Sequence, residues 1–243
     1  GDVLTQSLGI TTGADNIITE MQIMRSRSIT KKIVDDLDLH TNYSYKGSLR
    51  NTPLYNNTPI TVKPDSTTDL NQLKSDILLS ISLSAEKELF NIEGKYMQSA
   101  GALCDAEEKK IALTDVQLPY SLYLPTVGTF IIEQVPGYES LNKPLLVHIS
   151  TPTKVAMELS KALQLSQYDK NTLLISASYT TPTPQKGIDI INRMVYYYNE
   201  AGITKKNLSA TNTESFINKR LVSIQKELTD VEENVEQYRT QRA

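Results

Sequence analysis

Residues 217–238, with the sequence INKRLVSIQKELTDVEENVEQY, decide the fold of the C-terminal part of the chain. Their apolar residues alternate at spacings of four and three, which is the heptad pattern of a coiled-coil helix. We call these residues the seam: Ile217, Leu221, Ile224, Leu228, Val231, Val235 and Tyr238. The chain then reaches Ala243 without a glycine, a proline or a capping residue. We therefore expect it to be a piece of a longer protein in which this helix continues.

The composition of the seam indicates what it pairs with. Leu221, Leu228 and Val235 fall at heptad position a, and the other four residues fall at d. Leucine at a with isoleucine at d disfavours a parallel dimer. None of the g-to-e′ pairs of a parallel homodimer would join opposite charges, and the second is repulsive: Arg220–Gln225, Glu227–Glu232 and Asn234–Arg239. The seam thus favours an antiparallel partner helix. The alternative is an ordinary amphipathic helix that packs on its own domain.

Composition narrows the class of protein. The 243 residues suffice for one or two domains, and 39% of them are hydrophobic. The formal net charge is −3 with scattered basic residues, which argues against nucleic-acid binding because that needs a basic face. A lone Cys104 forms no internal disulfide and suits either the cytosol or a bacterial periplasm. The sequence contains no signal peptide and no apolar run near the ~20 residues that cross a bilayer.

The N-terminal two thirds alternate between one helix and several strands. Residues 1–13 are polar and predict a loop, and Asp15 is the expected N-cap of a helix over 15–37. Residues 51–57 predict a turn, and the prolines from Pro119 to Pro144 predict loops. Period-two patterns predict strands over 42–46, 60–63, 76–84, 89–94, 110–116, 130–133 and 145–149.

The following segment has a more regular order. The strand 145–149 leads to Ser150-Thr151-Pro152, a cap followed by proline, which predicts a helix over 152–163. A strand over 173–179 precedes a second cap-and-proline step, Thr181–Pro184, which opens the last helix. This β-α-β-α order predicts neighbouring strands with helices on one face. A last helix of about 58 residues would be about 87 Å long. It should leave a globular body of roughly 32 Å diameter.

These patterns together predict an α+β fold. A mixed β-sheet base domain packed by helices is expected over 14–207, after a flexible segment over 1–13. The long C-terminal helix should begin a coiled-coil arm over 208–243. Both the helix over 15–37 and the helix over 184–200 have broad apolar faces, so we expect them to pack side by side.

The sequence lacks the motifs that carry common chemistry. It contains no phosphate-binding loop, no dinucleotide fingerprint, no H-E-x-x-H and no C-x-x-C. His40 and His148 stand far apart in the sequence without companion ligands, and adjacent carboxylates such as Asp35-Asp36 suit solvated surfaces. We therefore predict no catalytic, cofactor-binding or metal site, and no ATPase, kinase or hydrolase activity.

Two stretches resemble a known family. Residues 15–39, with Asn16, Glu20 and the run Arg25-Ser26-Arg27-Ser28, resemble the opening helix of Wzz-type chain-length determinant domains. Residues 173–238 resemble the closing strand and long helix of the same domain, and residues 40–145 do so more loosely. The whole chain is similar to the periplasmic part of bacterial polysaccharide co-polymerases, especially the branch fused to a cytoplasmic tyrosine autokinase.

This resemblance implies a periplasmic domain held between two inner-membrane helices. Rings of such protomers would control the chain length or export of capsular, exo- or O-antigen polysaccharide. The implied partners are other copies, the flanking transmembrane helices, the polymerase, an outer-membrane exporter and the growing polysaccharide. The resemblance also implies that Ser26, Arg27 and Ser28 belong to a motif of the family's opening helix. Any kinase motifs would lie beyond the second membrane helix.

A second reading is the periplasmic coiled-coil adaptor of an efflux or secretion pump. Adaptors usually flank their hairpin with small β-rich halves, whereas here a β-α-β-α unit leads directly into the long helix. That order favours the co-polymerase. A soluble enzyme with a helical arm is disfavoured because the catalytic motifs are missing.

Overall fold

The computed structural model describes residues 13–85, 88–98, 107–137, 141–169 and 172–240. The chain divides into two compact units, one up to Tyr197 and one from Tyr198 on. The first unit contains the described strands and short helices, and the second is the continuation of one helix, α5 (Pro184–Thr240). The predicted α+β class is confirmed. The domain boundary predicted at 208 lies within the same helix.

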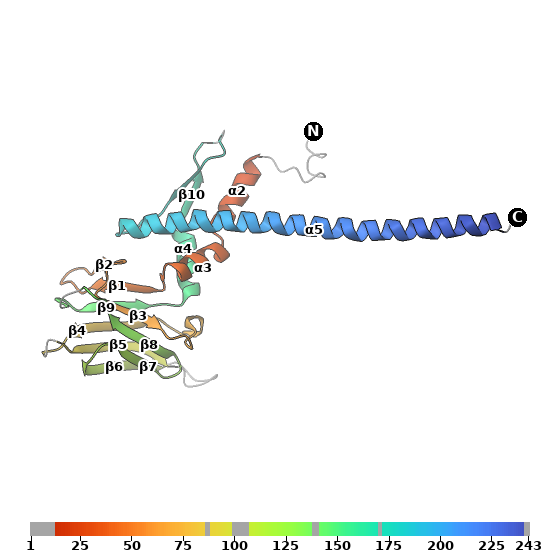
Figure 1. Cartoon of the computed structure of the whole chain (residues 1–243). Coiled ribbons are helices and arrows are strands. Elements are labelled where there is room, and N and C mark those ends of the chain that lie inside the picture. The colour runs from red at the N-terminus through yellow and green to blue at the C-terminus, as the bar shows by residue number, and fades with distance from the viewer. Residues whose placement is uncertain (1–12, 86–87, 99–106, 138–140, 170–171, 241–243) are drawn as a thin grey trace. The chain divides into compact units, whose positions relative to one another are not determined.

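Antiparallel sheets form the body of the first unit (Figure 1). One sheet has six strands, in the order β2 (Thr52–Leu54), β1 (Thr41–Tyr45), β9 (Leu145–Ile149), β4 (Ile77–Leu83), β5 (Phe90–Gln98) and β6 (Glu107–Val116). A second sheet has the order β3 (Ile60–Pro64), β8 (Gly128–Gln134) and β7 (Tyr120–Leu124). A separate hairpin pairs β10 (Gln164–Gln167) with β11 (Ile175–Ser178). Every pairing among the described strands is antiparallel.

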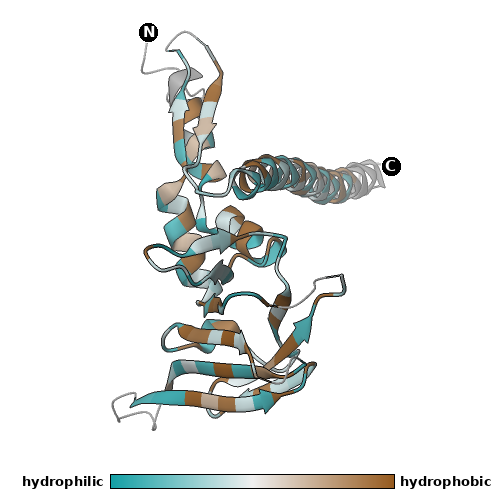
Figure 2. Ribbon diagram, turned by 90° about the vertical axis from the view of Figure 1, so that its left-hand side faces the viewer, coloured by the Kyte–Doolittle hydropathy of each residue, from teal (hydrophilic) through white to brown (hydrophobic). Residues whose placement is uncertain are grey.

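The two larger sheets share one hydrophobic core. Along β4, Ile77, Leu79 and Ile81 are buried while the residues between them face the other way, as the two-residue period of a strand requires. Figure 2 shows this alternation as bands of opposite hydropathy along the strands. Phe130 and Ile132 of β8 belong to the same buried cluster and are fully inaccessible. The sheets therefore pack face to face through their apolar sides.

A helical layer completes the first unit. α2 (Gly13–Met24) and α3 (Arg27–Asp36) come first, and α4 (Pro152–Ala162) follows β9. Thr151 caps α4 by accepting a hydrogen bond from the backbone N–H of Lys154 at 3.3 Å, and Pro152 occupies the first turn, as predicted. The buried apolar side chains of this layer include Ile17 of α2, Ile29, Ile33 and Val34 of α3, Ala156 and Leu159 of α4, and Ile190 and Met194 of α5.

All eight predicted strands are confirmed. The predicted ranges 42–46, 60–63, 76–84, 89–94, 110–116, 130–133, 145–149 and 173–179 correspond to β1, β3, β4, β5, β6, β8, β9 and β11. The predicted helix over 152–163 is α4. A short 3₁₀ helix, η1 (Leu70–Gln72), was not predicted. The loop predicted over 1–13 lies outside the described residues apart from Gly13, where α2 already begins.

Three short strands were missed. β7 lies between Pro119 and Pro125, in a segment predicted as loop, yet its alternate residues Leu122 and Leu124 are buried in the core. β2 contains Pro53, which is tolerated because β2 is an edge strand and needs no second partner there. β10 consists largely of polar residues and gives no strand signal of its own.

The continuous helix predicted over 15–37 was wrong in one respect, because the structure divides it into α2 and α3. Arg25 and Ser26 separate them. The backbone of Ser26 is extended, and its hydroxyl accepts a hydrogen bond from the N–H of Ile29 at 3.5 Å, which makes it the N-cap of α3. The chain therefore turns and starts a new helix. α2 begins at Gly13, so Asp15 lies inside its first turn and is not the predicted N-cap.

The predicted β-α-β-α neighbourhood was also wrong. β9 has β1 and β4 as neighbours, whereas β11 pairs with β10. β10 starts directly after α4 and is joined to β11 by residues 168–174, with the backbone hydrogen bond from Tyr168 N–H to the Leu174 carbonyl at 2.8 Å continuing the pairing. Closing this short loop costs little chain entropy, so the local hairpin forms instead of a crossover to β9.

The length of α5 agrees with the sequence. Its 57 residues correspond to about 86 Å of helix. Gly202 and the threonines of residues 211–213, which were the weak positions, do not interrupt it. Thr211 and Thr213 donate their hydroxyl hydrogens to carbonyls one turn earlier, at 3.1 and 2.8 Å, and so fit the helix without competing for its backbone bonds. In the described part of the chain, no helix has the length and apolar character of a transmembrane segment.

Replacing Phe130 by alanine tests whether the inter-sheet core determines stability. Phe130→Ala should lower the free energy of unfolding by about 3–5 kcal/mol, because a fully buried ring leaves a cavity between the sheets. Tyr123→Ala on β7, where the side chain is 68% exposed, should change it by less than about 1 kcal/mol. Urea unfolding followed by circular dichroism measures both. Similar losses for the two variants would contradict a shared core between the sheets.

Candidate functional site

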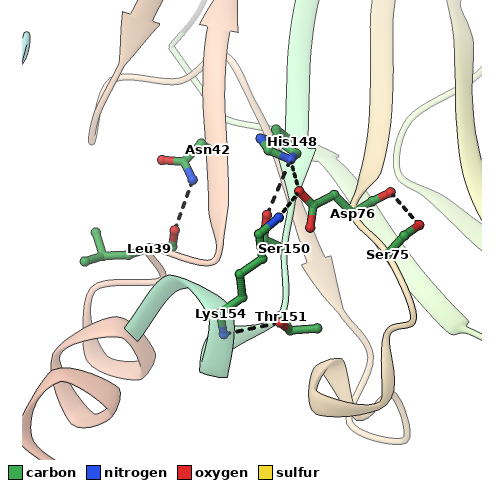
Figure 3. A network of polar contacts seen from close by, with 8 residues as sticks. All are labelled: Leu39, Asn42, Ser75, Asp76, His148, Ser150, Thr151 and Lys154. Carbon is green, nitrogen blue, oxygen red and sulfur yellow. Dashed lines mark hydrogen bonds and ion pairs between the residues drawn. The ribbon is translucent and has the colours of Figure 1, made fainter. Parts of the chain in front are cut away.

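A polar cluster lies where β4, β9 and α4 meet (Figure 3). Asp76 Oδ2 is 2.8 Å from His148 Nε2 and 2.7 Å from Lys154 Nζ. Ser150 Oγ lies 3.4 Å from the same nitrogen of His148. Two basic side chains therefore converge on one carboxylate. With a side chain 23% exposed, Asp76 is less accessible than either of its two partners.

Strand register and helix capping position these groups. β4 and β9 pair with Leu78 opposite His148, so Asp76, two residues before Leu78, lies on the same side as the imidazole. Val147 and Ile149 of β9 face the core, which turns His148 to the opposite face. The Thr151 cap starts α4 at Pro152 and brings Lys154 into the first turn. A lysine is unfavourable near a helix N-terminus, and the carboxylate of Asp76 offsets that charge.

The ionisation of Asp76 and Lys154 reflects this pairing. Partial burial alone would raise the pKa of Asp76, but hydrogen bonds from Lys154 and His148 more than offset it and hold the pKa below its ordinary value. The hydrogen bond to Asp76 raises the pKa of Lys154. The pair is therefore ionised across the neutral range.

The order Ser150, His148, Asp76 suggests a nucleophile relay, but the geometry does not provide one. In such a relay the carboxylate binds Nδ1 of the imidazole and the serine binds Nε2. Here Asp76 and Ser150 both lie at Nε2. One ring nitrogen cannot accept the serine proton while it donates to the carboxylate. Ser150 is also only 4% exposed. The arrangement is suited to fastening the end of β4 to β9 and α4.

A cleft of about 530 Å³ adjoins the cluster. Its charged lining residues are Lys74, Lys95, Lys154, Asp76 and Glu108. Lys95 is paired with Glu108 at 3.1 Å, and Lys154 with Asp76. Both carboxylates of the lining are therefore paired with a lysine, and Lys74 leaves one net positive charge in the lining of the cleft.

The seam lies on α5, in the unit from Tyr198 on. Its described side chains are 47–56% exposed, and they are Ile217, Leu221, Ile224 and Leu228. Val231, Val235 and Tyr238 belong to the same helix, but their side chains lie outside the described part of the chain. The spacing of four and three places the described members along one side of the helix. They form an apolar stripe that is about half accessible to solvent.

The family-like motif has a structural role. Ser26 is the N-cap of α3, and its carbonyl accepts hydrogen bonds from the N–H and the hydroxyl of Thr30 at 2.9 and 3.1 Å. The carbonyl of Arg25 accepts a hydrogen bond from Ser160 of α4 at 2.7 Å. Arg27 and Ser28 are exposed on the first turn of α3. The motif thus fixes the turn between α2 and α3 against α4.

The expected contact between the N-terminal helices and the start of α5 is present in the first unit. Arg193 Nε lies 2.8 Å from Asp36 Oδ2 of α3. Lys32 Nζ lies 5.3 Å from the ring centre of Tyr197, within the range of a cation–π contact. Ile190 and Met194 in the same turns of α5 are buried. The contact joins the C-terminal half of α3 to the first turns of α5, whereas α3 packs mainly against α4, so the predicted side-by-side packing of 15–37 with 184–200 is met only in part.

Sequence reasoning missed the partner of His148. The two histidines were predicted to be solvated or hydrogen-bonded without companion metal ligands, and no partner was named for either. The pairing of β4 with β9 brings Asp76 to His148. That register was not readable from the sequence, because nothing in either strand identifies its partner. No group of three or more histidine, cysteine or acidic residues that could hold a metal ion occurs among the residues that the structure describes.

The pH dependence of stability should follow Asp76. Its folded pKa is lowered, so its stabilisation is complete above the ordinary carboxyl pKa of about 4 and is lost as pH falls through the folded value. The raised pKa of Lys154 means that the pair persists until pH rises past about 10.4. Asp76→Asn should therefore cost about 1 kcal/mol at pH 7 and less below pH 4.

Glu108→Gln is the matched control for Asp76→Asn, because it removes one carboxylate from a half-exposed pair with Lys95. It should cost less than about 0.5 kcal/mol at pH 7. Urea titrations at pH 3, 7 and 9 compare the two variants with the unmodified chain. A cost for Asp76→Asn that stays constant from pH 3 to pH 7 would show that its charge is not responsible.

Comparison of the chain with protein-family models and with curated proteins found no match in either case. A function therefore has to be argued from the residues and contacts described above.

Proposed function

We propose that the chain is the periplasmic scaffold domain of a bacterial inner-membrane polysaccharide co-polymerase, which controls the chain length or export of a surface polysaccharide. The observation that carries this proposal is the half-exposed seam on α5, a helix whose first turns belong to the strand-containing unit. An apolar stripe of this kind has its function in pairing with another helix. We therefore propose that these residues serve in assembly and have no catalytic role.

The pairing partner we propose is an antiparallel helix. Leu221 at position a and Ile224 at position d disfavour a parallel dimer, and Glu227 would face Glu232 across a parallel seam. An antiparallel partner removes that repulsion. In the family that the sequence resembles, the long helix belongs to a coiled-coil arm within the same protomer, and rings form through contacts between base domains.

The contact between Asp36 and Arg193 supports a domain that is joined to a membrane at both ends. In the resembled family the domain lies between two inner-membrane helices, which requires its first and last base-domain elements to be neighbours. The contact between α3 and the first turns of α5 brings an N-terminal helix of the base domain next to the start of the arm, which supports that arrangement. The same contacts, with Tyr55 donating its hydroxyl hydrogen to Asp189 at 2.8 Å, anchor α5 to the segments around β1.

The pump-adaptor alternative has one observation in its favour. The order of strands and helices argued against it as long as β9 and β11 were expected in one sheet. The structure instead shows antiparallel sheets before a long helix, which is nearer to the β-rich base of an adaptor. The co-polymerase remains our proposal because of the α3–α5 contact and the sequence resemblance. The co-polymerase proposal predicts a returning helix and a membrane span encoded beyond residue 243, and sequencing the gene past that position would distinguish the two.

Seam variants in the intact protein test the proposed function. Ile224→Glu places a charge in the apolar stripe and should shorten or broaden the length distribution of the polysaccharide, because the arm no longer pairs. Lys226→Glu introduces the same residue two positions away, outside the seam, and should leave the distribution unchanged. Gel electrophoresis of the surface polysaccharide from a strain carrying each variant gives the result. An unchanged distribution with Ile224→Glu would contradict the scaffold role of the seam.

The 243-residue chain by itself should be monomeric or only weakly associated in solution. The parallel seam is repulsive at Glu227–Glu232, and a single helix buries little apolar surface. Light scattering at several protein concentrations measures the mass. A stable oligomer that survives deletion of residues 212–243 would contradict weak base-domain contacts. One that dissociates after that deletion would show that the seam pairs with itself.

A further inference from the structure

A second cavity lies at the edge of β1 in the first unit, and we call it the β1 edge pocket. It has a volume of about 710 Å³, within the ~300–1,000 Å³ range of small-ligand sites. Its walls are residues 37–43, the segment 54–58, residues 61–64 of β3, Val135, and Lys186 of α5. β2 pairs with β1 only from Tyr43 to Tyr45. The pocket therefore opens where β1 has no strand neighbour on that side, at Thr41 and Asn42.

Lys186 gives the pocket a positive charge that no carboxylate neutralises. Its Nζ donates a hydrogen bond to the Asn42 side-chain carbonyl at 2.8 Å. The side-chain nitrogen of Asn42 in turn donates a hydrogen bond to the Leu39 carbonyl at 3.1 Å, which orients the Asn42 side chain. Burial lowers the pKa of Lys186. Within the described ranges no ion pair includes Lys186. An ammonium group withdrawn from water beside a neutral amide is unfavourable unless an anion joins it.

The carboxylates nearest to Lys186 in the sequence or in the pocket do not cancel the positive charge of the pocket. Asp189, one turn after Lys186, accepts hydrogen bonds from Tyr55 and Gln185 at 2.8 Å each. Asp36 is paired with Arg193. Asp38 is the single acidic residue among those that line the pocket, which also include two lysines, Lys63 and Lys186. The lining therefore carries one net positive charge when the histidine is neutral.

Two buried polar side chains of the same wall have an unused hydrogen-bonding atom. His40 and Thr41 are 7% and 9% exposed, and both line the pocket. His40 Nδ1 and Thr41 Oγ1 have no hydrogen-bond partner in the part of the chain that the structure describes. Burial lowers the pKa of His40, although Asp38 and Asp35 raise it, so the imidazole is neutral at pH 7. Buried polar groups ordinarily have partners, and a bound ligand can supply them after a small side-chain rotation.

We propose that the β1 edge pocket binds a carboxylate carried on a hydroxylated body, of which an acidic sugar is the representative, with Lys186 as the charge partner and His40 and Thr41 as hydrogen-bonding groups. One net positive charge matches a monocarboxylate better than a phosphate, which carries close to two negative charges. Asn42, Tyr55, Thr58 and Thr61 line the same pocket and carry amide and hydroxyl groups of the kind that bind sugar hydroxyls. The assignment to a sugar rests on the proposed function, whereas the anion site does not.

Isothermal titration of the chain with glucuronate, glucose, acetate and inorganic phosphate tests the site. Glucuronate should bind at least about tenfold more tightly than the other three, since it alone offers one carboxylate and several hydroxyls. Glucose binding as tightly as glucuronate would overturn the role of the charge. Acetate doing so would overturn the hydroxylated body, and phosphate binding more tightly would overturn the monocarboxylate. Absence of binding by all four would overturn the site.

Lys186→Met removes the charge and keeps the apolar stem, and it should weaken glucuronate binding about tenfold or more. Lys206→Met, on an exposed position of the same helix, is the matched control and should bind like the unmodified chain. Thr41→Val keeps the shape and should weaken binding severalfold. Carbon-13 NMR of the lysine side chains should show the Lys186 pKa rising when glucuronate binds. Unchanged binding in Lys186→Met, or an unmoved pKa, would overturn the proposal.

These measurements use purified protein and no polysaccharide assembly. Loss of glucuronate binding in the titration would therefore leave the seam experiment to decide the scaffold role. If Ile224→Glu left the polysaccharide length distribution unchanged, the scaffold role would be contradicted, but the anion site would still be judged by the titration alone.

Discussion

The packing of two antiparallel sheets against each other is the constraint on which the first unit depends. Phe130 and Ile132 from one sheet and Ile81, Ile92 and Leu145 from the other are withdrawn from solvent in a single cluster. Because side chains alternate along a strand, burying these residues fixes which residues face outward. Asp76 and His148 lie on an outward face for that reason, and their ion pair depends on the core that they do not enter.

Sequence patterns predicted the elements that carry a strong period. β4, β9, α4 and the long α5 follow from alternation, capping and helical spacing. Patterns failed where a stronger local interaction competed. Ser26 has a helix-compatible neighbourhood but caps a new helix, and polar β10 becomes a strand because β11, close by in the sequence, pairs with it. β7 was hidden by its flanking prolines, which mark where the strand ends.

The candidate sites were less predictable than the fold. The seam was visible because it is local, with its members within one helix. Asp76 with His148, and Lys186 with Asn42, join residues separated by 72 and 144 positions. Such pairs depend on strand register and on where a helix begins, and single-sequence patterns specify neither. Lys186 illustrates this, because in the sequence it is an ordinary lysine in the first turn of an amphipathic helix.

The charged start of β6 limits how copies of the chain can associate. β6 is an outer strand of the six-stranded sheet, and it begins with the exposed run Glu107-Glu108-Lys109-Lys110. Lys109 pairs with Glu107 at 2.8 Å within the strand, and Glu108 pairs with Lys95 of β5. A foreign strand added here would have to desolvate these ions and break their pairing. Sheet extension across molecules is thereby discouraged on this side, so growth into fibres by edge-to-edge addition is opposed by the same residues that keep the surface hydrated.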